Sequence, residues 1–342
     1  MKNASQMMQW GNMPCVRLDA GGYTALIAPD LGSNVIRFRS ERDGVEFFRF
    51  SPDNTYETLI KSAEVWGLPT LYLPNRFADG VLRTSDAVYH LPVNEKAPYN
   101  NHIHGFLHKR RHEVKEHGAD ANCAWCVTEY VYNENDPFFK HLPIPFRATY
   151  RFTVSAQGLE YEFTLTNLSD KQMPISVATH TTINSPFVDG AREADERIQA
   201  PVGRRCLLND RCLPAISNVN EGFADLDIHD LEYRSGSRCP VLRNIDNEMY
   251  FAEHLDIKGE PFYGILCEDT ASGKTIAYEI SENYKFWIFW NDKGYNGYFC
   301  PEPMSAMIDA PNLELPPAMT GYQELAPEQE ITFRQRFFVK ED

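Results

Sequence analysis

Two side chains in the sequence combine acid–base chemistry with an unusual local frame. His180 ends an apolar run and stands between two threonines, whose hydroxyls can orient an imidazole that exchanges protons near neutral pH. A hydrogen-bonded histidine of the core is the alternative interpretation. Glu302 follows another apolar run and stands between two prolines, which stiffen the backbone and aim the carboxylate. Because a surface loop needs no such frame, we interpret Glu302 as a functional residue.

Arg76 and an H-x-H pair are further candidates for binding polar ligands. Prolines fix the backbone ahead of Arg76, whose planar guanidinium suits sugar hydroxyls or a carboxylate, although a surface arginine in a turn fits equally well. On a strand, His102 and His104 would point to the same face, as a metal ion or a polyol requires. Since no third ligand motif accompanies the pair, we predict no metal site. The basic run 109–111 is most simply a solvated strand entry, with phosphate binding as the alternative.

Strand patterns dominate the elements that must position these residues. Between residues 159 and 165, large apolar side chains alternate with glutamate and threonine, which is typical of a half-buried antiparallel strand. We predict further strands at 23–28, 35–38, 148–154, 173–179, 276–280, 284–290 and 331–339. Only one stretch looks helical, from a cap at Asn54 or Thr55 to Ala63.

Strands without intervening helices favour stacked antiparallel sheets over a parallel α/β sheet. The predicted fold is therefore all-β, a large antiparallel β-sandwich with few short helices. No internal repeat, low-complexity tract or linker divides the chain. We therefore expect a single domain over residues 1–342.

Composition limits the partners of the protein. Lys+Arg total 33 and Asp+Glu total 48, so the net charge of −15 opposes binding to nucleic acid. No uncharged apolar run approaches the ~18 residues of a membrane span. The first residues do not resemble a secretory signal, and the eight cysteines include only one C-x-x-C, at Cys123 and Cys126. We therefore expect reduced thiols in a cytoplasmic protein, without nucleic-acid or membrane partners.

Taken together and in this order, the segments resemble the aldose 1-epimerase (galactose mutarotase) family. The resemblance runs from about residue 20 to residue 338. A single glycine follows His104, where most members carry two, which suggests a divergent bacterial branch. The matching motifs are Asn75-Arg76-Phe77-Ala78-Asp79-Gly80, Ile103-His104-Gly105, Ala178-Thr179-His180, Glu302-Pro303 and Asp309-Ala310-Pro311-Asn312.

The resemblance implies a β-sandwich with a sugar cleft on one face and an isomerase that interconverts the α and β anomers of an aldohexose. Glu302 would be the base on the C1 hydroxyl, and His180 the acid on the ring oxygen, with His104 as a second histidine there. Arg76 and Asn75 would bind sugar hydroxyls. Opening a hemiacetal removes the O1 proton and protonates O5, so no metal or organic cofactor is needed. A carboxylate near His180 would favour the charged imidazolium.

One segment departs from the family pattern. Where members carry a sugar-binding aspartate, this chain offers Glu248 by spacing and Asp246 by residue type, and we predict Glu248. This departure leaves the natural sugar open. The alternatives are a non-catalytic sugar-binding or sugar-sensing protein on the same fold, and a hexose-6-phosphate 1-epimerase that uses the run 109–111. A homodimer is compatible with the sequence.

Overall fold

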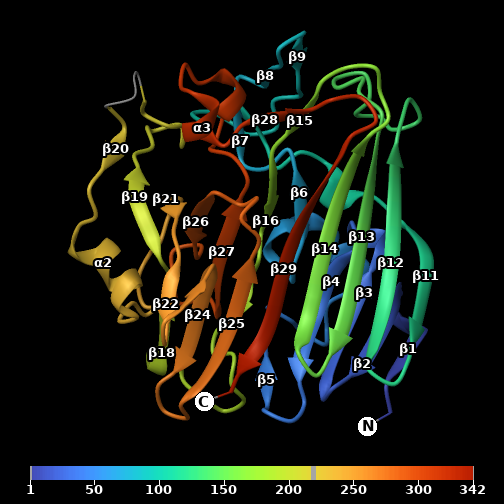
Figure 1. The fold of residues 1–342 in the computed structure, drawn as a ribbon, viewed down its shortest axis with the longest axis vertical. Coiled ribbons are helices and arrows are strands. Elements are labelled where there is room, and N and C mark those ends of the chain that lie inside the picture. The colour runs from blue at the N-terminus through green and yellow to red at the C-terminus, as the bar shows by residue number, and fades with distance from the viewer. Residues whose placement is uncertain (1, 217–220, 342) are drawn as a thin grey trace.

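The computed structural model describes residues 2–216 and 221–341, and antiparallel strands form most of it (Figure 1). The largest surface is an eight-stranded sheet, here called the front sheet, which spans the width of the molecule. Its strands in spatial order are β11 (Glu113–Ala119), β12 (Cys123–Tyr132), β13 (Phe146–Ser155), β14 (Gly158–Asn167), β29 (Glu330–Lys340), β25 (Lys274–Ile280), β24 (Gly264–Asp269) and β18 (Glu196–Gln199).

Two sheets lie behind the front sheet. The N-terminal sheet contacts its β11–β14 half. The second, here called the site sheet, lies behind the other half. The N-terminal sheet contains β1 (Ala4–Trp10), β2 (Met13–Ala20), β3 (Tyr23–Ala28), β4 (Asn34–Ser40) and β5 (Val45–Glu46). The site sheet contains β20 (Phe223–Ala224), β19 (Val202–Cys206), β21 (Glu248–Ala252), β26 (Phe286–Trp290), β27 (Tyr298–Met304), β16 (Val177–Thr179) and β6 (Thr70–Tyr72), with β17 (Ile183–Asn184) beside β27.

Alternation of side chains explains why these strands stack as layers. On β14, Leu159, Tyr161, Phe163 and Leu165 are buried, whereas the glutamates between them reach solvent. The inward rings join a continuous aromatic core, in which Tyr278 of β25 stacks on another ring of the front sheet at 4.2 Å. The predicted all-β antiparallel sandwich is confirmed.

The site sheet is covered on both faces. Trp287 and Phe289 of β26 point into the main core, whereas Phe286 and Ile288 point to the opposite face. There they join a second apolar cluster with Met304 and side chains from the segment 306–322. This second face, turned away from the front sheet, is where the candidate site lies.

Helices are short, and one differs from prediction. Thr55 and Thr58 form a capping box at the start of α1 (Tyr56–Leu59), as expected, but the helix ends early and continues as the 3-10 turn η2 (Ile60–Val65). The helix α2 (Ile228–Ser235), capped by Asp227, was not predicted. No helix among the described residues is long and apolar enough to cross a membrane.

The other elements are short connections and two-stranded ribbons. They are η1 (Pro29–Leu31), β7 (Arg76–Ala78), β8 (Val81–Arg83), β9 (Val88–His90), β10 (Asn101–Ile103), η3 (Leu107–Lys109), β15 (Met173–Ile175), η4 (Glu193–Asp195), β22 (Leu255–Ile257), β23 (Glu260–Phe262), η5 (Ala310–Asn312), α3 (Pro317–Thr320) and β28 (Gln323–Leu325). β7 pairs with β10, and this ribbon carries two of the candidate residues.

Candidate active site

Glu302 lies in the middle of β27, on the second face of the site sheet. It stands directly opposite Ile288, so the carboxylate shares the face of Ile288 rather than that of the main core. Only 3% of the residue is exposed. Tyr298 and Cys300 share this face, because side chains two residues apart on a strand point the same way.

His180 comes directly after β16 and reaches the same face. Its backbone N–H donates to the Pro69 carbonyl at 3.0 Å, which holds the chain beside the start of β6. The ring Nε2 lies 3.3 Å from Glu302 Oε1, and the residue is 5% exposed. Its Nδ1 is buried and has no hydrogen-bond partner among the described residues. The structure therefore brings together the two groups predicted for acid–base chemistry.

His104 lies beside this pair. Its ring centroid is 5.4 Å from that of His180, and its backbone N–H donates to the Asn75 carbonyl at 2.9 Å. The backbone at His104 is left-handed, with φ +64°. At Gly105 (φ +59°) a Cβ atom would lie 2.1 Å from the Tyr72 carbonyl oxygen, so only glycine fits.

The H-x-H pair does not share a face as predicted. His102 lies elsewhere: its Nδ1–H donates to the Pro92 carbonyl at 2.7 Å, and its ring packs against Phe138. The alternation of a strand ends at Ile103, because His104 takes the left-handed conformation. Among the residues that the structure describes, no group of three or more His, Cys, Asp or Glu side chains is arranged to hold a metal ion.

Arg76 is buried on β7 and already carries several partners. Its Nε and Nη2 atoms donate to the Glu95 carboxylate at 3.1 and 3.0 Å. Its Nη1 atom donates to Asn247 Oδ1 at 3.3 Å and to Asn75 Oδ1 at 3.4 Å. Neither Glu95 nor Asn247 is among the site residues predicted from the sequence. No local pattern marks them, since residues 76, 95 and 247 meet only through the folded chain.

The structure does not bring Glu248 to this cluster. Glu248 begins β21 opposite Phe289, on the face of the main core. Its carboxylate accepts from the Tyr233 hydroxyl at 2.9 Å and the Tyr250 hydroxyl at 3.2 Å, and Arg238 lies at 3.4 Å. The prediction is wrong by one position along the strand. Asn247 contacts Arg76, whereas the side chain of Glu248 points to the other face of the sheet. Asp246, the other option, is exposed.

Burial dominates the electrostatics of the pair. It raises the pKa of the Glu302 carboxyl well above its usual range, and the nearby Arg76 charge opposes this shift. Burial lowers the pKa of His180 to about 4 and that of His104 well below the usual range. The expectation that a nearby carboxylate would keep His180 charged is therefore wrong, because burial outweighs the favourable charges around it. Burial thus favours the neutral form of both side chains.

The basic run 109–111 is compensated by carboxylates. Lys109 lies 3.4 Å from Glu64, and Arg110 lies 2.6 Å from Asp136. Arg111 lies 3.1 Å from the carboxylate of Asp30. Each of these cations has a carboxylate partner, so the run is not an unpaired cationic patch.

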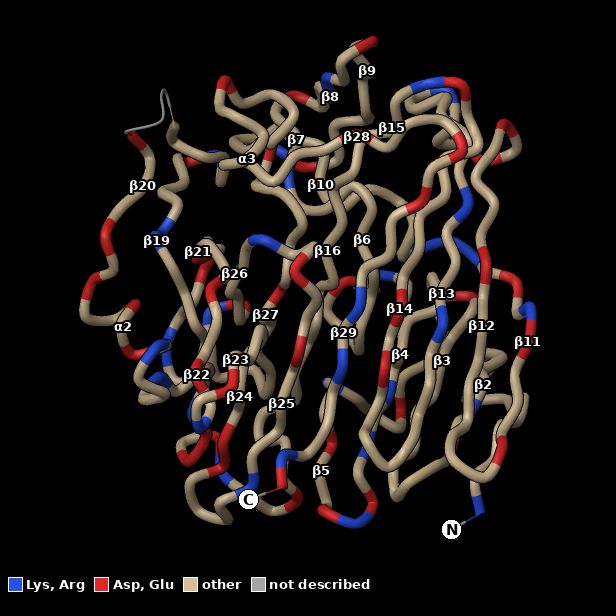
Figure 2. The backbone as a smooth tube through the Cα atoms, viewed as in Figure 1, with Lys and Arg blue, Asp and Glu red and all other residues tan. Residues whose placement is uncertain are grey.

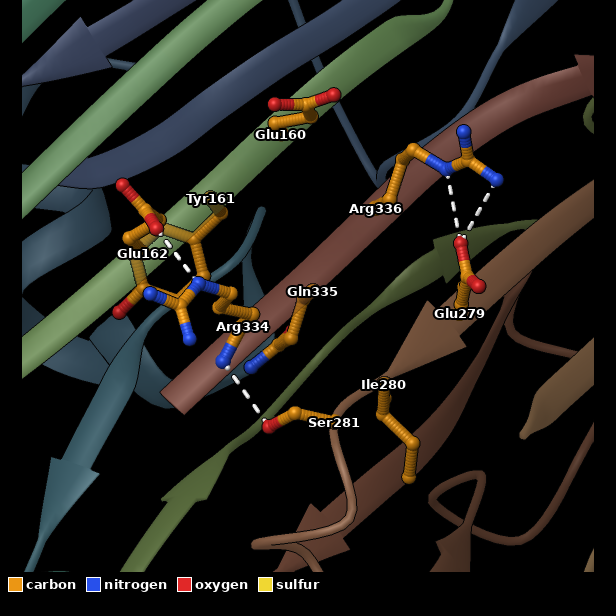
Figure 3. Close-up of a pocket in the computed structure, with 9 residues that line it drawn as sticks. All are labelled: Glu160, Tyr161, Glu162, Glu279, Ile280, Ser281, Arg334, Gln335 and Arg336. Atoms are coloured by element: carbon orange, nitrogen blue, oxygen red, sulfur yellow. Dashed lines mark hydrogen bonds and ion pairs between the residues drawn. The ribbon is translucent and has the colours of Figure 1, made fainter. Parts of the chain in front are cut away.

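A groove of about 480 Å³ lies on a different surface, the outer face of the front sheet. Figure 3 shows side chains of β14, β29 and β25 around it. Arg334 pairs there with Glu162 at 2.7 Å, and Arg336 with Glu279 at 2.8 Å. None of the candidate catalytic residues lines this groove.

The fold and the buried carboxylate–imidazole pair define a galactose mutarotase-like β-sandwich. The chain belongs to the aldose 1-epimerase family, whose model matches residues 14–337. A galactose mutarotase-like protein from Clostridium acetobutylicum superimposes with a TM-score of 0.95 at 28% identity, with 100% of this chain and 99% of that chain covered.

Two more distant relatives are also similar. A galactose 1-epimerase from Lactobacillus acidophilus has the same fold, with a TM-score of 0.70 at 14% identity and both chains covered completely. Protein LacX (plasmid) of Lactococcus lactis is 20% identical over 236 residues, which are 67% of this chain and 71% of LacX.

Proposed function

We propose that the protein is an aldose 1-epimerase that interconverts the α and β anomers of an aldohexose. The observation that carries the proposal is the distance of 3.3 Å between His180 Nε2 and Glu302 Oε1 on a nearly buried face. Family membership supports an isomerase that acts on a sugar. The specific sugar and the roles of individual residues belong to the proposal.

In the proposed reaction the pair keeps one proton throughout. The proton is on His180 when the sugar reacts, and the Glu302 carboxylate faces the C1 hydroxyl. Glu302 takes the O1 proton while His180 gives its proton to O5, and the C1–O5 bond breaks to leave an open-chain aldehyde. After rotation about C1–C2, the same transfers in reverse close the ring as the other anomer. Atoms and charge balance without a cofactor.

The neighbouring residues would orient the sugar. His104, whose ring lies against that of His180, is suited to contact the ring oxygen, and it is an alternative proton donor there. Arg76 would contact a sugar hydroxyl with the one Nη2 N–H that Glu95, Asn247 and Asn75 leave over, and its charge favours the ionised form of Glu302. Asn75, buried and in contact with Arg76, would hold that guanidinium in place.

The proposal also covers the domain organisation, partner and location of the whole protein. We propose that residues 1–342 act as one domain, that the partner is a small monosaccharide, and that the protein works in the cytoplasm. A non-catalytic sugar-binding protein on the same fold is the alternative from another class. It would need neither the base nor the acid, so retention of both favours the enzyme.

Polarimetry of freshly dissolved α-D-galactose and α-D-glucose tests the proposal. We expect wild-type protein to accelerate mutarotation and Glu302→Gln to lower turnover by ~10²–10⁴-fold, since the amide cannot accept the O1 proton. Glu279→Gln, which changes a carboxylate of the front-sheet groove, is the matched control and should keep full activity. Circular dichroism checks that both variants fold.

Two results would contradict the proposal. Full activity of Glu302→Gln would show that another group is the base. No acceleration of either sugar, together with saturable sugar binding by calorimetry, would favour the binding protein.

A further inference from the structure

A row of aromatic rings leads from the catalytic pair along the second face of the site sheet. The Trp290 ring lies 5.9 Å from that of His180 and 6.1 Å from that of Tyr298. Tyr298 shares its face of β27 with Glu302, four residues away. The row ends at Arg49, whose guanidinium lies 4.0 Å from the centre of the Tyr298 ring.

Arg49 is held rigidly at the end of this row. The guanidinium lies between two rings, because Trp66 is on its other side at 3.9 Å. Its Nη1 donates to the Val65 carbonyl at 3.0 Å. Its backbone N–H donates to the Thr182 carbonyl at 2.8 Å, which ties it to the segment that carries His180. The residue is partly exposed, so a ligand can reach it.

Arg49 differs from several other arginines that lie over aromatic rings, because it has no carboxylate at ion-pair distance among the described residues. Arg37, Arg110 and Arg336 also lie over aromatic rings, and each pairs with a carboxylate at 2.6 to 2.9 Å. In the part of the chain that the structure describes, no ion pair involves Arg49. The carboxylate of Asp292 instead accepts from the Tyr298 hydroxyl at 3.3 Å. Burial lowers the pKa of Arg49, and the neighbouring Tyr298 and Asp292 oppose this shift, but among the described residues no carboxylate lies within ion-pair distance of the guanidinium.

The spacing suits a single sugar ring. Four residues of β27 separate the Cα atoms of Tyr298 and Glu302 by ~13 Å, about the length of a hexose with a hydrogen bond at each end. Cys300 lies between them on the same face, and the charges of both Glu302 and Arg49 act on the pKa of its thiol. A sugar with C1 at Glu302 can therefore direct its C6 end toward Arg49.

We propose that Arg49, clamped between Trp66 and Tyr298, binds a carboxylate on the end of the sugar remote from C1. The substrates of the enzyme then include hexuronic acids, and this inference rests on the proposed function of the same site. One guanidinium edge presents two parallel donors to the two oxygens of a carboxylate and matches its single charge. A phosphate dianion would keep one negative charge uncompensated.

Calorimetric binding of D-glucuronate, D-glucose and D-glucose 6-phosphate tests this inference. We expect wild-type protein to bind glucuronate ~10–100-fold more tightly than glucose, as a charge-assisted pair predicts. Arg49→Met should reduce this preference to about threefold or less, since it removes the charge and keeps an unbranched side chain. Arg336→Met is the matched control, because it removes an arginine that lies over a ring on the front sheet and should keep the preference.

The outcomes separate this inference from the proposed function. Equal binding of glucuronate and glucose, an undiminished preference in Arg49→Met, or a preference for glucose 6-phosphate over glucuronate would each overturn the carboxylate site. If Arg49→Met does not fold, Arg49→Lys keeps the charge without the planar fork, and an undiminished preference there would also overturn the inference. Binding is measured without turnover, so failed polarimetry with a normal glucuronate preference would contradict the proposed function alone.

Discussion

The front-sheet groove and the second face of the site sheet both contain charged and titratable side chains, but these side chains are exposed in the groove and buried on the site sheet. In the groove, Arg334 and Glu162 pair across neighbouring strands with 64% and 37% of their side chains exposed (Figure 3). On the site sheet, Glu302 and His180 lie at 3.3 Å with only 4% and 6% of their side chains exposed. Acidic and basic residues occur along most of the strands and loops that the structure describes (Figure 2).

The difference indicates that the proposed catalytic groups are distinguished by their burial and not by a large surface groove. Water screens the ion pairs of the groove, so they contribute little stability and leave both partners charged. On the site sheet, burial raises the pKa of Glu302 and lowers that of His180, which favours the neutral form of each group. Groups perturbed in this way exchange protons readily and are typical of catalytic sites.

The largest effect that would sharpen this comparison is the pH dependence of turnover. A pair with one proton offers both an acid and a base, whereas a doubly protonated pair has no base. Because the pKa of His180 is lowered to about 4, the acid limb of kcat/KM should have its midpoint near pH 4, with about a tenfold loss per unit below it. Polarimetry from pH 3 to 8, corrected for the buffer-catalysed rate, measures this profile.

An acid limb near pH 6.5, the pKa of a free imidazole, would contradict this account. Folding must be followed by circular dichroism at each pH. Burial also lowers the pKa of His102 to about 4, so the unfolded state binds more protons than the folded state between pH 6.5 and 4. Stability is therefore lost as the pH falls through that window, and only the range in which the protein stays folded is informative.

The fold could be predicted from the sequence because each sheet buries one regular face. On β14 the alternation alone identified the strand and its inward residues. The helix α2 was missed, since it is stabilised by the capping box of Asp227 and Asp230 rather than by a continuous apolar face.

The site could be predicted only in part. Glu302 and His180 stand out through their local frames and the family resemblance, and their roles remain predictions. Glu95 and Asn247 could not be found, because their contacts with Arg76 depend on how distant segments meet. Glu248 was misplaced because a shift of one residue along a strand moves a side chain to the other face.

A substitution at Glu248, on the opposite face of the same sheet, should have a smaller effect. We expect Glu248→Gln to leave the KM for sugar unchanged and to lower the free energy of unfolding by ~1–3 kcal/mol. The physical reason is that Arg238, 3% exposed, would lose one of its two carboxylate partners. Urea unfolding and polarimetry measure the two quantities on the same sample. A raised KM with unchanged stability would contradict this placement and indicate that Glu248 binds the sugar.

The smallest effect is expected for a substitution in the front-sheet groove. Arg334→Met removes the partner of Glu162, but water reaches both side chains and screens the pair, so the free energy of unfolding should change by less than ~1 kcal/mol. Mutarotation should keep the wild-type rate, because Arg334 is exposed on the front sheet and Glu302 is not among the residues that line this groove. Urea unfolding and polarimetry measure both. A loss of turnover with normal stability would mean that the exposed groove, and not only the buried pair, takes part in the reaction.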